Sequence, residues 1–262
     1  MSDRSTVMAE AQRLLEPLAT KLKAQGYHLV YACVVGSHAY GTDTPDSDID
    51  VRGVVTRCPK DILIGKDDEP FRDHEHDVTI YTFDKFVRML ANGNPNIMDM
   101  MGVSPECILY QTDVSWKVYD NIHLFMSRRI ATAYRGFGRS SLNQVLRLER
   151  YMDDNKKICK AMMHHIRTLN AGAQMLLTGK PCACATDVET LRFLRDGGGL
   201  DKYGAMTDRF LELSECAEEA LSAALRVTSL PERADMEGIE NLLAEVNADV
   251  LEIMWEEQNE ED

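Results

Sequence analysis

The chain has 262 residues, 44% of them hydrophobic, so it is long enough to bury a substantial core, as one large domain or two small ones, without disulfide bonds. Its 43 acidic and 29 basic side chains give a net charge of −14, which argues against a surface that wraps long polyanions. Seven scattered cysteines, no signal-peptide pattern and no stretch near the roughly 18 apolar residues of a membrane span predict a reduced, soluble, cytoplasmic protein.

The first third of the chain predicts a small sheet with flanking helices. Apolar residues at helical spacing predict a helix over residues 6–25, and the apolar run at 27–35 predicts a buried strand that ends at a glycine. Residues 48–56 and 76–83 alternate polar with apolar side chains, which is typical of strands with one face in a core. A helix and three strands indicate an α+β fold for this part.

The rest of the chain is predicted to be helical. Its helical patterns lie at residues 128–152, 156–179, about 203–227 and about 232–256. Because the hydrophobic periodicity changes near residue 110, we expect two domains: an α+β domain over residues 1–110 and an all-helical domain over residues 111–262.

Two carboxylates in the stretch "DSDIDVRGV" carry the first chemical signal. Asp48 and Asp50 are two residues apart on a predicted strand, so their side chains share one face while Ile49 points to the other. At a rise of about 3.3 Å per residue, their Cα atoms stand roughly 6 to 7 Å apart, which lets both carboxylates coordinate hard cations. Pairs of such ions serve phosphoryl and nucleotidyl transfer. Asp-x-Asp is also common in acidic loops, where it only meets solvent.

A glycine-serine turn precedes these carboxylates. Gly36 directly follows an apolar run, so the backbone can turn sharply there, and Ser37 opens a short helical turn that Gly41 breaks. Backbone N–H groups at such a turn, with the serine hydroxyl, can hold phosphate oxygens. The two motifs together predict a site in which one element holds a triphosphate and the next strand holds its metal ions.

Gly36-Ser37 followed by Asp48-Ile49-Asp50 resembles the signature of the polymerase-beta-like nucleotidyltransferase superfamily. The stretch "GSHAYGTDTPDSDIDVRGV" resembles the RNA-repair-pathway-associated branch, and the likeness extends more weakly over residues 30–180. It implies a small mixed nucleotidyltransferase sheet followed by a helical substrate-binding domain. It also implies metal-dependent transfer of NMP from an NTP to a hydroxyl acceptor, with Mg²⁺ as cofactor and Mn²⁺ as the alternative.

The resemblance further implies a third carboxylate from a neighbouring strand. Asp77 occupies that place, where it would complete the metal site, and Asp73 and Glu75 are alternatives for the same role. An acidic residue often follows the family's turn at "GNPN", and Asp99 stands in that place.

Several basic residues are candidates for binding the nucleotide. Arg52 shares the strand face of the carboxylates, where it either pairs with them or reaches a substrate phosphate. Lys160, His164 and Arg167 recur at i, i+4 and i+7 on one predicted helix face, which is either a cationic wall opposite the triphosphate or a solvated face. The resemblance to the family's basic helical segment favours nucleotide binding.

Other polar motifs favour structural interpretations. Arg135 and Arg139 could add to the cationic wall, but the glycines beside them also suit a helix start or kink. Cys182 and Cys184 lack the paired spacing that structural zinc requires. The glycine run at 196–200 reads as a loop between helices, because no strand precedes it.

The sequence thus predicts a metal-dependent nucleotidyltransferase with an NTP substrate, and it leaves the acceptor and the oligomeric state open. The resemblance implies an RNA terminus, whereas the net charge favours a compact acceptor such as a tRNA end, a small molecule or a hydroxyl of another protein. The alternatives are an antitoxin-like enzyme that adenylylates a partner protein and a module that binds nucleotide without turnover.

Overall fold

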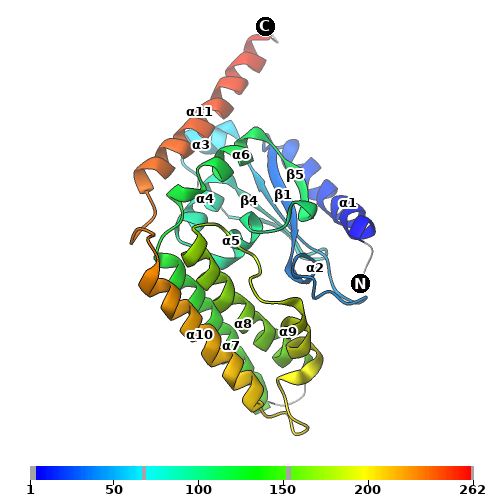
Figure 1. Cartoon of the computed structure of the whole chain (residues 1–262). Coiled ribbons are helices and arrows are strands. Elements are labelled where there is room, and N and C mark those ends of the chain that lie inside the picture. Colours follow the sequence, from blue (N-terminus) through cyan, green and yellow to red (C-terminus); the bar gives the residue numbers. More distant parts are fainter. Residues whose placement is uncertain (1–3, 67–68, 152–154, 261–262) are drawn as a thin grey trace.

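A mixed sheet of five strands forms the centre of the N-terminal half (Figure 1). The structure is a computed structural model that describes residues 4–66, 69–151 and 155–260. The strands are β1 (Leu29–Val35), β2 (Asp50–Val55), β3 (Phe71–Asp73), β4 (Val78–Thr82) and β5 (Ile108–Gln111). They lie side by side in the order β3-β4-β2-β1-β5.

The register of the central strands brings the predicted site residues to one end of the sheet. β1 runs antiparallel to β2 with Val35 opposite Asp50, so the C-terminal end of β1 meets the N-terminal end of β2. β2 runs parallel to β4 with Val51 opposite Val78. The segments that precede β2 and β4 and the turn that follows β1 are therefore neighbours.

Helices cover both faces of the sheet. Ala32 and Val34 of β1 pack into a core with helix α1 (Arg4–Lys23), whereas the alternate residues Tyr31 and Val35 pack into a larger core on the other face. The remaining helices of this half are α2 (Gly36–Tyr40), α3 (Pro59–Leu63), α4 (Phe83–Ala91), α5 (Pro95–Met101), η1 (Pro105–Cys107), α6 (Asp113–Asp120) and η2 (Ile122–Leu124).

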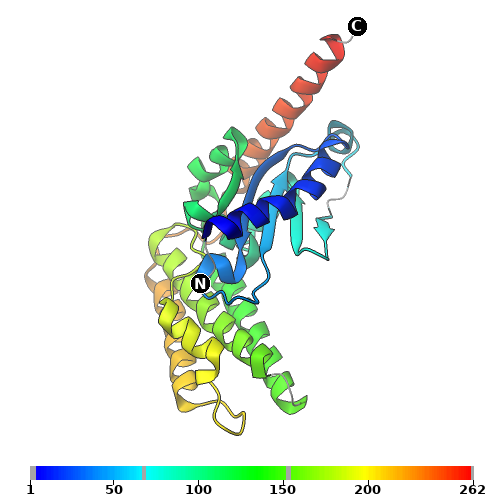
Figure 2. The same ribbon diagram turned by 90° about the vertical axis from the view of Figure 1, so that its right-hand side faces the viewer.

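The C-terminal half is helical, as Figures 1 and 2 show. Its elements are α7 (Arg129–Tyr151), α8 (Asn155–Thr178), α9 (Val188–Phe193), the π-helical turn η3 (Leu194–Gly198), α10 (Asp208–Val227) and α11 (Met236–Glu260). α8 is the central helix and contacts α7, α9, η3 and α10. The predicted fold class, a small mixed sheet with flanking helices followed by a helical region, is confirmed.

The structure differs from the predicted elements in the sheet. β3 and β5 were not predicted, because strands of three and four residues at the two edges of a sheet are too short for a periodic pattern. β2 begins at Asp50, so Asp48 lies in the loop before the strand instead of on it. Asp77 likewise lies in the turn that precedes β4.

The division into domains at residue 110 stays a prediction, and the large core runs across it. That core joins β1 and α4 to α8, and it includes Ile239, Leu242 and Val246 of α11. α11 returns to the N-terminal half, where it contacts α3 and α4, and Lys117 of α6 pairs with Glu245 over 2.5 Å and with Asp249 over 3.0 Å.

The negative charge of the chain is concentrated in its last two helices and the residues around them. Residues 208–262 hold 17 acidic and three basic side chains, which accounts for the whole net charge of −14. α10 lies on the far side of α8 from α9, and α11 lies against the sheet half (Figures 1 and 2). None of the helices in the described part of the chain has the length and apolar character to span a membrane.

Candidate active site

The glycine-serine turn lies against the second carboxylate of the Asp-x-Asp motif. α2 follows β1 directly, and Gly36 takes a φ of 70°, in the left-handed region that favours glycine. A Cβ atom at position 36 would fall well under 3.0 Å from the Oδ2 atom of Asp50. No described residue bonds the hydroxyl of Ser37. The turn and the carboxylate therefore face one shared space, and the serine hydroxyl is available to a ligand.

Asp77 is held beside Asp50 by the sheet. The amide of Val51, next to Asp50 in the chain, donates a hydrogen bond to the carbonyl oxygen of Asp77 over 3.2 Å. Asp77 has a φ of 50°, which aspartate tolerates better than most residues, and its side chain is exposed. The exposed Asp48 comes from the loop before β2.

The charges of the predicted site residues act together at Asp50. Burial raises the pKa of the Asp50 carboxyl. The positive charges of Arg52 and Lys160 lower that pKa, and the negative charges of Asp77 and Asp48 raise it. The structure thus brings four other predicted residues, from both halves of the chain, within electrostatic reach of the half-buried carboxylate of Asp50.

The donors present fit Mg²⁺ or Mn²⁺ in a site that the substrate completes. Within the described residues, no three His, Cys, Asp or Glu side chains are close enough to hold a metal by themselves. Mg²⁺ prefers oxygen ligands and is usually bound by one or two carboxylates, with water and substrate phosphates filling the other positions. Asp50 with Asp48 or Asp77 supplies such carboxylates next to the Gly36-Ser37 turn.

Arg52 is anchored by helix α5. Its Nη1 atom donates to the carbonyl oxygen of Asn96 over 2.9 Å, and its Nη2 atom lies 3.5 Å from the Asn96 Oδ1 atom. The guanidinium therefore acts on Asp50 through its charge while α5 fixes its position.

Lys160 and His164 lie on the part of α8 that faces the site, but only Lys160 carries a charge there. Lys160 is exposed, and His164 is half-buried. Burial lowers the pKa of His164 to about 3, and the positive charges of Arg167, Lys160 and Arg195 lower it as well. The imidazole is consequently neutral at physiological pH, so it can bind a ligand by a hydrogen bond and not by charge.

Arg167 does not share the exposed face of Lys160. Its Nη2 atom lies 3.1 Å from Asp99 Oδ2, its Nη1 atom donates to Asp99 Oδ1 over 3.2 Å, and both side chains are buried. The guanidinium also lies 4.1 Å from the ring centroid of Tyr40, and the Tyr40 hydroxyl donates to Asp99 over 2.6 Å. The continuous basic face expected along α8 ends here, because the helix passes from the surface into the core between Lys160 and Arg167. Arg167 instead joins α8 to α5 and α2.

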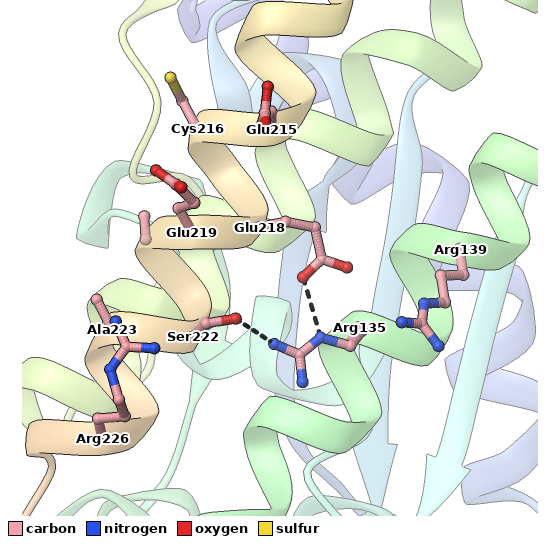
Figure 3. A pocket seen from close by; sticks show the side chains of 10 residues that line it. Arg135, Arg139, Glu215, Cys216, Glu218, Glu219, Ser222, Ala223 and Arg226 are labelled. Carbon is pink, nitrogen blue, oxygen red and sulfur yellow. Dashed lines mark hydrogen bonds and ion pairs between the residues drawn. The ribbon is translucent and has the colours of Figure 1, made fainter.

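Arg135 and Arg139 line a different cavity. A groove of about 920 Å³ separates α7 from α10, and Figure 3 shows the two arginines on one wall and acidic residues of α10 on the other. Arg135 donates to Glu218 over 3.0 Å and to Ser222 over 2.8 Å. These bonds hold Arg135 between the two helices, so it does not join a cationic wall at the sheet.

Sequence reasoning missed Arg192 and Arg195. Both lie in the α9–η3 segment and donate to the loop between α2 and β2. The sequence predicts a loop at the glycine run 196–200, and in the structure Arg195 lies in the turn η3, whose backbone leaves the helical conformation at Gly197 with a φ of 104°. The local signal was the i, i+3 spacing of the two arginines, but their partners lie about 150 residues earlier in the chain.

Comparison with known proteins agrees with this geometry. Residues 10–245 match the family described as RlaP, RNA repair pathway DNA polymerase beta family. The chain is also 30% identical over 127 residues to a protein of Enterobacteria phage T4 described as an uncharacterized 38.9 kDa protein in the nrdC-mobD intergenic region. That match covers 42% of this chain and 36% of the phage protein, so it spans about a third of the relative's length. The chain belongs to the RNA repair pathway DNA polymerase beta family.

Proposed function

We propose that the protein transfers NMP from an NTP to a hydroxyl group at an RNA end. The observation that supports this proposal is the close approach of Asp50 to Gly36, where an added Cβ would collide with Asp50 Oδ2, because a turn suited to phosphate then lies beside a carboxylate suited to a metal ion. A site for triphosphate and a site for its metal ions then share one space, as in-line attack on an α-phosphate requires.

Three groups of this chain are suited to hold the triphosphate. The backbone at Gly36 and the free hydroxyl of Ser37 would bind its β and γ phosphates. Lys160 would approach from the helical half, and Arg52 would complement the charge of the phosphates from the sheet. These groups fix the nucleotide in position before the acceptor arrives, and positioning supplies much of the rate in this kind of reaction.

Asp48, Asp50 and Asp77 would hold Mg²⁺ or Mn²⁺ together with oxygen atoms of the triphosphate. The bound ions would supply charge neutralisation at the phosphates and an acidified acceptor hydroxyl. Burial, and after it Asp77 and Asp48, raise the pKa of Asp50, which agrees with such a role because a bound cation would stabilise the charged carboxylate.

Family membership supports an RNA acceptor, and the distribution of charge does not oppose one. Since residues 208–262 hold the whole net charge, the remaining residues, which include the site, are neutral overall. The acidity of the chain therefore does not oppose the approach of RNA to the site.

The test measures transfer of label from each α-³²P nucleoside triphosphate in the presence of Mg²⁺ or Mn²⁺. Total cell RNA and lysate protein are supplied as acceptors, and Asp50→Asn is the inactive control. Labelled RNA supports the proposal. Label on protein alone indicates an adenylyltransferase of the antitoxin kind, and nucleotide binding without any labelled product indicates a non-catalytic module.

A further inference from the structure

Two arginines from the α9–η3 segment hold the loop that leads to the carboxylates. Arg192 donates from Nη2 to the carbonyl oxygen of Gly41 over 2.7 Å. Arg195 follows three residues later on the same side of the segment and donates to two hydroxyls of the loop. The loop at 41–47 is thus fixed at both of its ends by the helical half of the chain.

Arg195 uses one nitrogen for both of its loop contacts. Its Nη2 atom donates to Thr44 Oγ1 and to Ser47 Oγ, each over 3.1 Å. Thr44 and Ser47 also bond each other, since the Thr44 amide donates to the Ser47 hydroxyl over 2.9 Å and the Ser47 amide to the Thr44 carbonyl over 3.0 Å. Asp48 follows at once, so the guanidinium is anchored one residue from a proposed metal ligand.

The other two nitrogens of the Arg195 guanidinium are not used by the loop. The side chain is half-buried, and neither Nη1 nor Nε has an acceptor among the described residues. The positive charges of Arg195 and of Lys160 on α8 both lower the pKa of His164, so both side chains act on the same imidazole. The parallel donor pairs of an arginine are Nη2 with Nη1 or Nη2 with Nε, so with Nη2 on the loop the Nη1 group remains as a charged donor for a phosphate oxygen.

We propose that Arg195 binds a phosphate oxygen of the nucleoside triphosphate through Nη1 while its Nη2 atom holds the 41–47 loop. This inference rests on the proposed function. In this proposal Arg195 takes the place expected for Arg167, which is buried against Asp99, and is the second cation beside Lys160 that binds the triphosphate from the helical half. Binding of the nucleotide would then join the α9–η3 segment to the sheet.

Binding of the α,β-methylene analogues of the four nucleoside triphosphates, measured by calorimetry with Mg²⁺ and without RNA, tests this proposal. Arg195→Gln should weaken the Kd for the bound analogue about tenfold or more, as expected for loss of charged hydrogen bonds. Arg195→Lys keeps the charge but has one nitrogen to serve both the loop and the phosphate, so it should give a smaller loss than Arg195→Gln. Arg192→Gln is the matched control, because it removes a contact to the same loop from the same segment, and it should change the Kd less than about twofold. Circular dichroism checks that each variant is folded. If Arg195→Gln does not fold, the affinity of Arg195→Lys is compared with that of the wild type instead.

Three outcomes overturn the inference. Equal losses in Arg192→Gln and Arg195→Gln would mean that both act by holding the loop. An unchanged analogue affinity in Arg195→Gln, with weaker binding of a single-stranded oligoribonucleotide, would assign Arg195 to the acceptor. If the wild-type protein binds none of the analogues, the proposed function itself is wrong. Failure of the Arg195 proposal alone would instead leave the wild-type affinity intact.

Discussion

The hydroxyl of Tyr40 donates to Asp99 Oδ2 over 2.6 Å, and this bond joins the last residue of α2 to the middle of α5. Arg167 completes the contact from α8, with its guanidinium over the Tyr40 ring. The helical turn that begins at Gly36 is therefore held at its far end by a buried ion pair. The position of the proposed phosphate-binding turn depends on residues that do not touch the phosphate.

Breaking this buried network should destabilise the protein strongly. Arg167→Met leaves the Asp99 carboxylate buried without its partner and should lower the free energy of unfolding by about 3 to 5 kcal/mol. Tyr40→Phe removes one hydrogen bond and should cost about 1 kcal/mol. Urea unfolding checks both values. In the double variant Asp99→Asn with Arg167→Met, the loss should be smaller than the sum of the single losses, and strict additivity would contradict a coupled network.

Replacement of Gly36 should impair nucleotide binding as well as stability. Gly36→Ala forces a Cβ atom against Asp50 and strains a left-handed backbone, so we expect about 1 to 3 kcal/mol lower stability and at least a tenfold weaker Kd for a nucleotide analogue. Gly41→Ala is the control, because its φ of 72° brings the same strain while its Cβ would meet Val188 at an ordinary 3.6 Å. Gly41→Ala should lose stability alone. Equal losses of affinity in both variants would refute a specific role for the Gly36 contact.

Replacement of Asp50 should separate activity from stability. Asp50→Asn removes a proposed metal ligand and should lower transfer by about 10²-fold or more, since the metal contribution amounts to several kcal/mol. The same change removes a carboxylate whose charge is disfavoured by burial and by Asp77, so the metal-free variant should melt at or above the wild-type temperature. Steady-state transfer assays and thermal melts measure the two effects. Asp46→Asn, at an exposed position of the preceding loop, should behave as wild type in both.

His164 should make the protein less stable as the pH falls below its ordinary pKa of 6.5. Burial and three nearby cations lower the folded-state pKa to about 3, so between these values the unfolded chain binds a proton that the folded chain does not. Stability from this residue is complete above pH 6.5 and is lost as the pH falls toward 3, by up to about 1.4 kcal/mol per pH unit. His164→Gln should flatten that slope in urea titrations at pH 7, 6 and 5. The exposed His28→Gln is the control, and an equal effect from it would exclude His164 as the source.

The central part of the site could be predicted from local sequence, because its signals are local. The buried run of β1 ends at Gly36, the alternating pattern continues through β2 and β4, and the structure has the predicted strand, turn and strand at these places. The two edge strands were too short to give a pattern. Helical spacing assigns Lys160 and Arg167 to one direction around α8, but periodicity does not give the depth at which each turn lies, and the structure buries Arg167 while Lys160 is exposed. Arg195 could not be found, since its contacts depend on how the chain returns to a loop far upstream.

The return of α11 to the sheet half has a consequence for the order in which the protein folds. Ile239, Leu242 and Val246 belong to the same core as residues of β1 and α4, and Asn247 donates to the buried Asp84 over 3.4 Å. During synthesis, α4 leaves the ribosome long before α11 exists, so its outer side stays uncovered until nearly the whole chain has been made. The nascent N-terminal half is thus an incomplete core with exposed apolar surface, and its folding is finished only when α11 packs against it.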